Sequence, residues 1–136
     1  MCHLITPNLP EAIKLTDINA PPVQLAASCL ALGAQAVLIK GGHANTSTAD
    51  DFYADQQGNS AWFSSPRINT RNTHGTGCTL SAAICANIAQ GKELKAACEQ
   101  AKQYLQNALM AAVNCNIGNG CGPVHHFHNL SSENNL

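Results

Sequence analysis

The residues with the clearest chemical potential form one segment, Asn72-Thr73-His74-Gly75-Thr76-Gly77-Cys78-Thr79. Gly75 and Gly77 carry no side chain, so successive backbone N–H groups can point at one cluster of oxygens. An Ala-rich helical pattern begins near Cys78, and a helix N-terminus adds unpaired N–H groups and a positive dipole. Residues 75–78, which include Thr76, are therefore predicted to form an anion hole for phosphate, or for charge that develops on a transferring phosphoryl group.

Cys78 is predicted to lie at the mouth of that hole. A helix N-terminus lowers the pKa of a thiol, so a thiolate would be available near neutral pH. Such a thiolate can take a proton from a substrate hydroxyl. A Gly-x-Gly before a helix is a weak signal by itself, and a tight loop that holds a buried cysteine is the alternative interpretation.

Strands and helices must alternate to position this segment. Residues 36–39 form a continuous apolar run that is typical of a buried parallel strand with helices on both faces, and the segment ends in Lys40-Gly41-Gly42. The alternation favours an α/β layered sheet in one domain. We expect further strands at residues 4–5, 51–54, 61–64 and 67–69, the middle two as a hairpin, and helices at 8–15, from 21–22 to Gly33, from 78 to Gly91, and 94–112.

The cysteines and the charged residues indicate less about function than about which side chains are buried. The seven cysteines are odd in number and have no CxxC spacing, so a disulfide framework is disfavoured. Cys29, Cys85 and Cys98 fall within helical patterns and are expected to be buried as small apolar residues. On the last helix, polar residues opposite the apolar stripe are expected to face solvent; they are Lys95, Glu99, Lys102, Gln103 and Gln106.

Composition excludes several classes of function. The 136 residues, of 14.3 kDa, suit one domain, and 45% of them are apolar. The formal net charge of -1 gives no basic surface for nucleic acid. Apolar runs are only a few residues long, which is too short for a bilayer span. The N-terminus lacks the pattern of a secretory signal, so we expect a cytoplasmic location.

Four ordered motifs resemble one family. Residues 74–84 closely resemble the anion-hole segment of the hydroxymethylpyrimidine/phosphomethylpyrimidine kinases, ribokinase-like enzymes of thiamine biosynthesis. Those kinases carry Cys at the position of Cys78, where most ribokinase-like enzymes carry Asp. Residues 5–12 are similar to the superfamily's Asn-x-x-Glu element, 37–43 to its Lys-Gly-Gly-His strand end, and 120–124 to its Gly-His-Gly-Pro-Val motif. The resemblance runs from about Leu4 to His126.

The resemblance implies a partial ribokinase-like three-layer α/β/α fold, namely the C-terminal half of the sheet with its helices. Residues 1–128 would be the nucleotide-binding part of the kinase domain, and residues 129–136 a polar tail. The implied activity is ATP-dependent phosphorylation of 4-amino-5-hydroxymethyl-2-methylpyrimidine and of its monophosphate, with Mg2+ as cofactor. The implied partners are this small-molecule substrate and, in the full-length family, a second copy of the chain in a homodimer.

Site residues carry over at the matching positions. Cys78 would be the base, with Gly75, Thr76, Gly77 and Cys78 as the anion hole. Lys40, Gly41, Gly42 and Gly77 would contact the nucleotide, since open α/β sheets bind ligands at the carboxyl ends of their strands. Glu11, through water, and Asn8 would hold Mg2+. Simpler roles remain open: Asn8 as a helix N-cap, Lys40 as a solvated lysine, and Asp51 as a turn or strand-start carboxylate rather than part of an ion network.

Departures from the family keep alternatives open. The half that precedes residues 5–11 in relatives, with most of the pyrimidine pocket, has no counterpart here. One alternative is a catalytically incomplete nucleotide-binding fragment, and another is a ribokinase-like kinase of the pyridoxal type. The number of cysteines alone suggests a third, a thiol redox or metal-binding protein. Cys121 stands where the family carries His, and the histidine-rich residues 125–128 have only a weak case as a zinc site.

Overall fold

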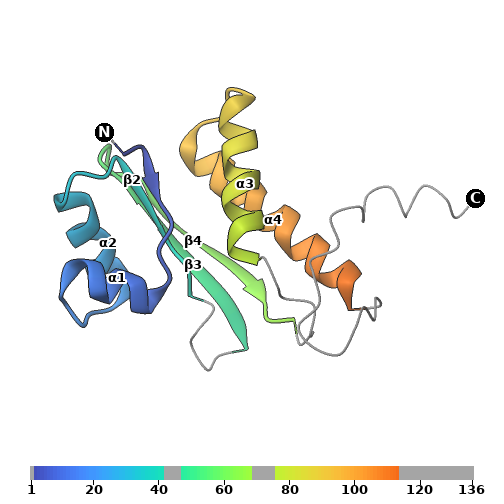
Figure 1. Ribbon diagram of the computed structural model, residues 1–136, viewed down its shortest axis with the longest axis horizontal. Coiled ribbons are helices and arrows are strands. Elements are labelled where there is room, and N and C mark those ends of the chain that lie inside the picture. The colour runs from blue at the N-terminus through green and yellow to red at the C-terminus, as the bar shows by residue number, and fades with distance from the viewer. Residues whose placement is uncertain (1, 42–46, 69–75, 114–136) are drawn as a thin grey trace, which may run out of the picture. The chain divides into compact units, whose positions relative to one another are not determined.

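The computed structural model describes residues 2–41, 47–68 and 76–113, and the chain falls into two compact units. The first unit is Met1–Arg67 and the second is Ile68–Leu136. Figure 1 labels the elements along the chain. In the first unit these are β1 (Leu4–Ile5), α1 (Leu9–Thr16), α2 (Pro22–Ala31), β2 (Ala36–Ile39), β3 (Thr48–Asp55) and β4 (Ser60–Pro66). In the second they are α3 (Thr76–Ala89) and α4 (Leu94–Ala112).

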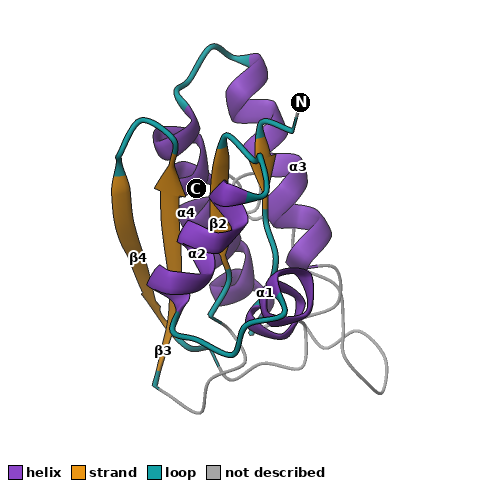
Figure 2. Cartoon of the chain, turned by 90° about the vertical axis from the view of Figure 1, so that its left-hand side faces the viewer, coloured by secondary structure: helices purple, strands orange, loops and turns teal. Residues whose placement is uncertain are grey.

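The first unit is built on a mixed sheet with the strand order β1-β2-β3-β4. β1 pairs with β2 in parallel, whereas β2–β3 and β3–β4 are antiparallel pairs. Helix α2 packs against β2 and β3, as Figure 2 shows from the helix side. All four residues of β2 are buried, as the apolar run predicted, but the strand is parallel to a neighbour on one side only.

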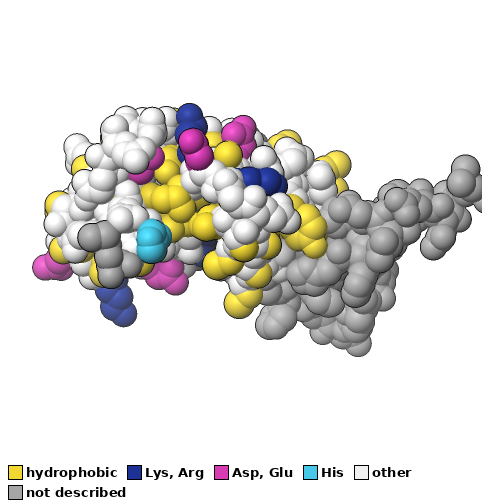
Figure 3. All heavy atoms as spheres, turned by 90° about the horizontal axis from the view of Figure 1, so that it is seen from above, with side chains coloured by type: hydrophobic (Ala, Val, Ile, Leu, Met, Phe, Trp, Pro, Cys, Tyr) yellow, Lys and Arg dark blue, Asp and Glu magenta, His cyan; other side chains and the backbone are white. Residues whose placement is uncertain are grey.

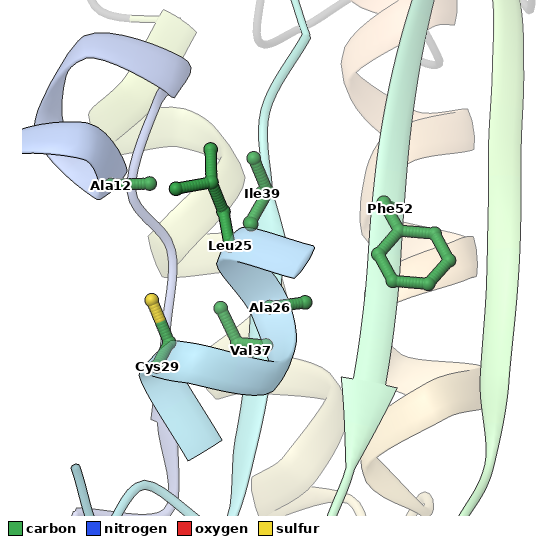
Figure 4. Packing of buried hydrophobic residues seen from close by; sticks show 7 residues of the cluster. All are labelled: Ala12, Leu25, Ala26, Cys29, Val37, Ile39 and Phe52. Atoms are coloured by element: carbon green, nitrogen blue, oxygen red, sulfur yellow. The ribbon is translucent and has the colours of Figure 1, made fainter. Parts of the chain in front are cut away.

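A small apolar core joins the helices to the sheet. Leu25 on α2 is fully buried and lies against side chains of β2 and β3 (Figure 4). Full burial of a leucine side chain stabilises a fold by roughly 1.5–3 kcal/mol, so this cluster is a main source of stability in the unit. Its members come from α1, α2, β2 and β3: Ala12, Leu25, Ala26, Cys29, Val37, Ile39 and Phe52.

The predicted hairpin is confirmed, with strands longer than expected. Its turn is organised by Asp55, whose carboxylate accepts hydrogen bonds from the backbone N–H groups of Gln57 (3.0 Å) and Asn59 (2.9 Å) and from the Tyr53 hydroxyl (3.0 Å). Burial raises the pKa of Asp55, but the hydrogen bonds from Asn59, Tyr53 and Gln57 outweigh it, so the pKa lies below its ordinary value.

Gln56, the next residue of the turn, reaches across to the C-terminus of α2. Its Nε2 donates to the carbonyl oxygens of Leu30 (2.8 Å) and Ala34 (3.1 Å). The Leu30 carbonyl oxygen also accepts from the Gly33 N–H (3.0 Å), so the Gln56 side chain gives this acceptor at the helix end a second hydrogen bond. The turn and the helix end are thereby joined although more than twenty residues separate them.

The second unit is an antiparallel helix pair in which α3 and α4 pack together. Ala97, Cys98 and Ala101 of α4 are fully buried. Polar side chains fix one end of the pair: Asn87 donates to the Ala97 carbonyl oxygen (3.1 Å), and the Lys92 ammonium donates to the Asn87 amide oxygen (3.1 Å). Small residues on both helices permit this close approach.

Three predictions about exposure and extent are wrong. Lys102 is 8% exposed, not on the solvent face; it lies four residues after Cys98 and next to Ala101, so its long stem borders the buried stripe and is covered with it. Cys85 is exposed, because Leu80 and Ile84 carry the buried face of α3. Arg67 and Ile68 are not in a strand, since β4 ends at Pro66; Asn69 lies outside the described residues.

Several large hydrophobic side chains reach the surface of the described part of the chain, and Figure 3 shows exposed apolar groups on one face. Trp62 on β4 is 52% exposed, yet its ring centroid lies 4.8 Å from that of Phe52, so one side of the indole still packs on the core. None of the helices that the structure describes combines the length and the apolar character needed to cross a membrane.

Candidate functional site

The carboxyl ends of β1 and β2 bring two predicted site residues together. Asn8 and Lys40 form an isolated parallel bridge just beyond the two strands, and the Lys40 N–H donates to the Pro7 carbonyl oxygen (2.9 Å). Parallel strands end at the same edge of a sheet, which is where α/β proteins bind ligands. The backbone of Lys40 is therefore fixed beside the start of α1, and its side chain is half-buried.

Asn8 and Glu11 form a reciprocal capping box at the start of α1. The Asn8 Oδ1 accepts from the Glu11 N–H (2.8 Å), and the Glu11 Oε2 accepts from the Asn8 N–H (2.8 Å). The N-cap role considered for Asn8 is thus confirmed. The box also fixes the rotamer of Glu11, whose exposed carboxylate is held at the N-terminus of the helix and adjacent to the strand ends.

Gly41 continues this edge in a crowded position. A Cβ at Gly41 would lie 1.9 Å from the carbonyl oxygen of Asp50, which is far inside van der Waals contact, so no other residue fits without a shift of backbone. The Gly41 N–H donates to the Asp51 Oδ1 (3.0 Å). Packing against β3 therefore gives Gly41 a structural reason to be glycine. Gly42 and His43 lie outside the described residues.

Asp51 is the residue of this edge whose importance the sequence understated. It lies inside β3 and is only 6% exposed. Its carboxylate accepts the hydrogen bond from the N–H of Gly41, the residue that follows Lys40. A buried carboxylate is costly unless donors satisfy it, so such a position is normally specialised. The signal in the sequence is a charged residue directly before Phe52 and Tyr53, in a segment that otherwise has the pattern of a buried strand.

The other predicted residues lie at the start of α3. The helix begins at Thr76, two residues before the predicted start, so Thr76, Gly77 and Cys78 form its first turn. Gly77 and Cys78 are exposed, and the first N–H groups of any helix lack partners within it. The cysteine is thus not buried in a tight loop, which was the alternative interpretation. His74 and Gly75 lie outside the described residues.

Residues 2–41, 47–68 and 76–113 do not meet the requirements of a metal site made of protein side chains alone. No group of three or more His, Cys, Asp or Glu side chains is gathered there. Cys121 and the histidine-rich residues 125–128 lie outside these ranges, so the expectations for them remain predictions.

Solved kinase structures share this fold. The Bacillus subtilis pyridoxal kinase, solved as an ADP complex, aligns with a TM-score of 0.82 at 34% identity, covering 93% of this chain and 49% of that one. The Staphylococcus aureus pyridoxal kinase in complex with AMP-PCP and pyridoxal aligns with a TM-score of 0.80 at 32% identity, covering 90% and 47%. These likenesses confirm the expected ribokinase-like α/β fold, in partial form.

Two sequence relatives are described as kinases of hydroxymethylpyrimidine and phosphomethylpyrimidine. A hydroxymethylpyrimidine/phosphomethylpyrimidine kinase of Salmonella typhimurium is 45% identical over 132 residues, and one of Escherichia coli is 44% identical over 130. Each alignment covers 92% of this chain and 48% of the relative, so the chain spans about half the length of the curated relatives it matches. The family model for phosphomethylpyrimidine kinase matches residues 1–125. The chain, with its Asn8–Glu11 box, its Lys40 strand end and its Cys78 helix start, belongs to the phosphomethylpyrimidine kinase family.

Proposed function

We propose that this chain is the nucleotide-binding part of a kinase that phosphorylates 4-amino-5-hydroxymethyl-2-methylpyrimidine and then its monophosphate, with ATP as the donor. The observation that carries the proposal is the family match over residues 1–125, because it includes every described candidate residue, both those near the ends of β1 and β2 and those at the start of α3. In the whole protein we further expect a homodimer, as the family resemblance implies, and a cytoplasmic location.

The edge formed by β1 and β2 supports a role in binding phosphates. Lys40 supplies a cation there, and an ammonium acts on phosphate as a point charge. Glu11 supplies an exposed carboxylate nearby, with Asn8 fixing its rotamer. Mg2+ is commonly held by one or two carboxylates, water and substrate phosphates, so a single carboxylate fits a Mg2+–nucleotide complex. When bound, the ion would neutralise phosphate charge; Glu11 and Asn8 are the residues that would hold it.

The start of α3 supports the transfer step. In the proposal, the first-turn N–H groups, together with Gly75, bind the transferring phosphoryl group, and Gly77 leaves room for it. Cys78 takes the proton from the acceptor hydroxyl, whose oxygen then forms the new bond to phosphorus as the bond to the departing ADP oxygen breaks. Such a reaction needs mainly positioning and charge stabilisation from the protein.

A coupled assay of ADP release, with hydroxymethylpyrimidine as acceptor, tests the proposal. Removal of a general base costs about 10²–10⁴-fold in rate, so Cys78→Ser should lower turnover at least about 100-fold and leave ATP affinity nearly unchanged. Cys85→Ser is the matched control, because Cys85 is also an exposed cysteine on α3. Equal turnover in Cys78→Ser and the control would remove Cys78 from the role of base.

The same assay shows whether the chain is active by itself and which acceptor it phosphorylates. The chain should be assayed alone and together with the N-terminal half of the Salmonella typhimurium relative. ATP binding without turnover by the chain alone, with turnover restored by the added half, would identify a nucleotide-binding fragment. Pyridoxal is the second acceptor to test, because the solved structures described above are of pyridoxal kinases. Turnover with pyridoxal alone would replace the pyrimidine in the proposal.

A further inference from the structure

We infer that Asp51 is a positioning residue for phosphate binding: it anchors the end of β2 so that Lys40 stays at the ligand-binding edge. The inference rests on the proposed function, since it assigns to Lys40 the phosphates of a nucleotide. Asp51 has no place in the motifs that define the site. It lies on β3, and its only route to the nucleotide in this inference is through the backbone of residues 40 and 41.

The geometry fixes the chain on each side of Lys40. On one side, the Lys40 N–H is bound to the Pro7 carbonyl oxygen at 2.9 Å, which ties it to β1. On the other, the next amide, that of Gly41, donates to the Asp51 carboxylate at 3.0 Å. The Asp50 carbonyl oxygen closes against the Gly41 Cα. β2 has no regular pairing with β3 beyond Ile39, so these contacts, rather than the ladder, set the course of the chain.

Strand alternation places Asp51 on the face of the sheet to which Lys40 belongs. Ile39 pairs with Phe52, and both belong to the apolar core on the helix face. Because successive side chains of a strand point to opposite faces, Lys40 and Asp51 are assigned to the opposite face. The 6% exposure of Asp51 leaves its carboxylate largely withdrawn from solvent, so a hydrogen bond to it is stronger than one in water. Loss of the carboxylate would free the Gly41 amide and so remove the restraint that follows Lys40, while the bond from the Lys40 N–H to Pro7 remains.

Nucleotide titrations of the full chain, followed by NMR, test this inference. ATP and adenosine are titrated into wild type, Asp51→Ala, Asp51→Asn, Lys40→Met and Asp55→Asn. A charge-assisted hydrogen bond that positions a ligand group is worth about tenfold in affinity, so Asp51→Ala should weaken ATP about tenfold and adenosine less than about twofold. Asp51→Asn retains an acceptor oxygen and should stay within about threefold of wild type for ATP.

Asp55→Asn controls for a general loss of stability, because Asp55 lies at the far end of the same strand and also holds backbone amides. Deuterium exchange at the Gly41 amide gives a second readout, and exchange should be slow in wild type and fast in Asp51→Ala. If Lys40→Met weakens ATP but Asp51→Ala does not, or weakens adenosine equally, the inference is overturned and the proposed function stands. If wild type binds no ATP, the proposed function falls and the inference falls with it.

Discussion

Replacement of Gly41 by alanine gives the sharpest test of the structure around Lys40. The added Cβ would lie 1.9 Å from the Asp50 carbonyl oxygen. Real Cβ atoms do not approach oxygen this closely, and the obstacle is backbone rather than a flexible side chain. The end of β2 must therefore move away from β3, and the hydrogen bond from the Gly41 N–H to Asp51 is lost with that movement.

The expected cost can be worked from these two effects. Overpacking that forces a backbone shift costs about 1–3 kcal/mol. Loss of a hydrogen bond to a buried carboxylate adds about 1.5–3 kcal/mol. Together they come to about 2.5–6 kcal/mol, a large part of the roughly 5–15 kcal/mol that stabilises a typical domain. With an m value of about 2 kcal/mol/M, the urea midpoint falls by roughly 1.2–3 M.

Urea unfolding followed by circular dichroism measures this change, with Gly58→Ala as the control. Gly58 has a positive φ of 89°, and a Cβ there meets no atom within 4 Å. Its replacement costs only the strain of a left-handed backbone, about 1–2 kcal/mol. If Gly41→Ala lowers the midpoint no more than Gly58→Ala does, the Asp50 carbonyl does not close against Gly41, and the reasoning about this strand end is wrong.

The remaining predictions concern the core, the hairpin and the thiols. Leu25→Ala should cost about 2–5 kcal/mol of unfolding free energy, whereas Leu32→Ala, at a side chain that is 63% exposed, should cost less than about 0.5 kcal/mol by the same urea titration. A lowered pKa in the folded state makes Asp55 stabilising above its unfolded pKa of about 4, and this contribution is lost as pH falls through the folded pKa. Asp55→Asn should therefore destabilise the chain at pH 7, and its urea midpoint should converge on that of wild type below about pH 4; a constant difference between pH 7 and pH 3 would contradict this. Burial raises the pKa of the Cys29 thiol, so alkylation followed by peptide mass mapping should modify the exposed Cys78 well before Cys29; equal rates in the folded chain would refute the burial.

Local spacing predicted those parts of the fold that depend on neighbours in sequence. Asn8 was expected to be able to cap a helix, and it does so; Glu11, three residues later, completes a capping box that was not predicted. The apolar run of β2 and the turn residues between β3 and β4 likewise produced the expected buried strand and hairpin. In each case the deciding interaction lies within one element or one turn.

The features that the sequence did not predict depend on contacts between elements. The Gly41–Asp51 contact requires the register of β2 against β3, and nothing within residues 40–42 contains it. Periodicity divides a helix into a buried face and a solvent-exposed face, and it assigns Lys102 to the exposed face. In the structure, neighbouring residues bury more of the helix surface than the apolar stripe alone, and Lys102 is covered with it. The relation of Cys78 to a phosphate also depends on atoms outside its own helix, and it stays a prediction.

The Gln56 side chain has a consequence for the order in which the first unit folds. Because its amide satisfies carbonyl oxygens at the end of α2, that helix gains this stabilisation only after the hairpin has closed and docked. Hairpins form in about 1–10 μs, whereas bringing distant segments together must also overcome loop-closure entropy. The helix terminus and the turn should therefore become protected from solvent exchange in a single kinetic phase, so that a break in the turn loosens the end of a helix far away along the chain.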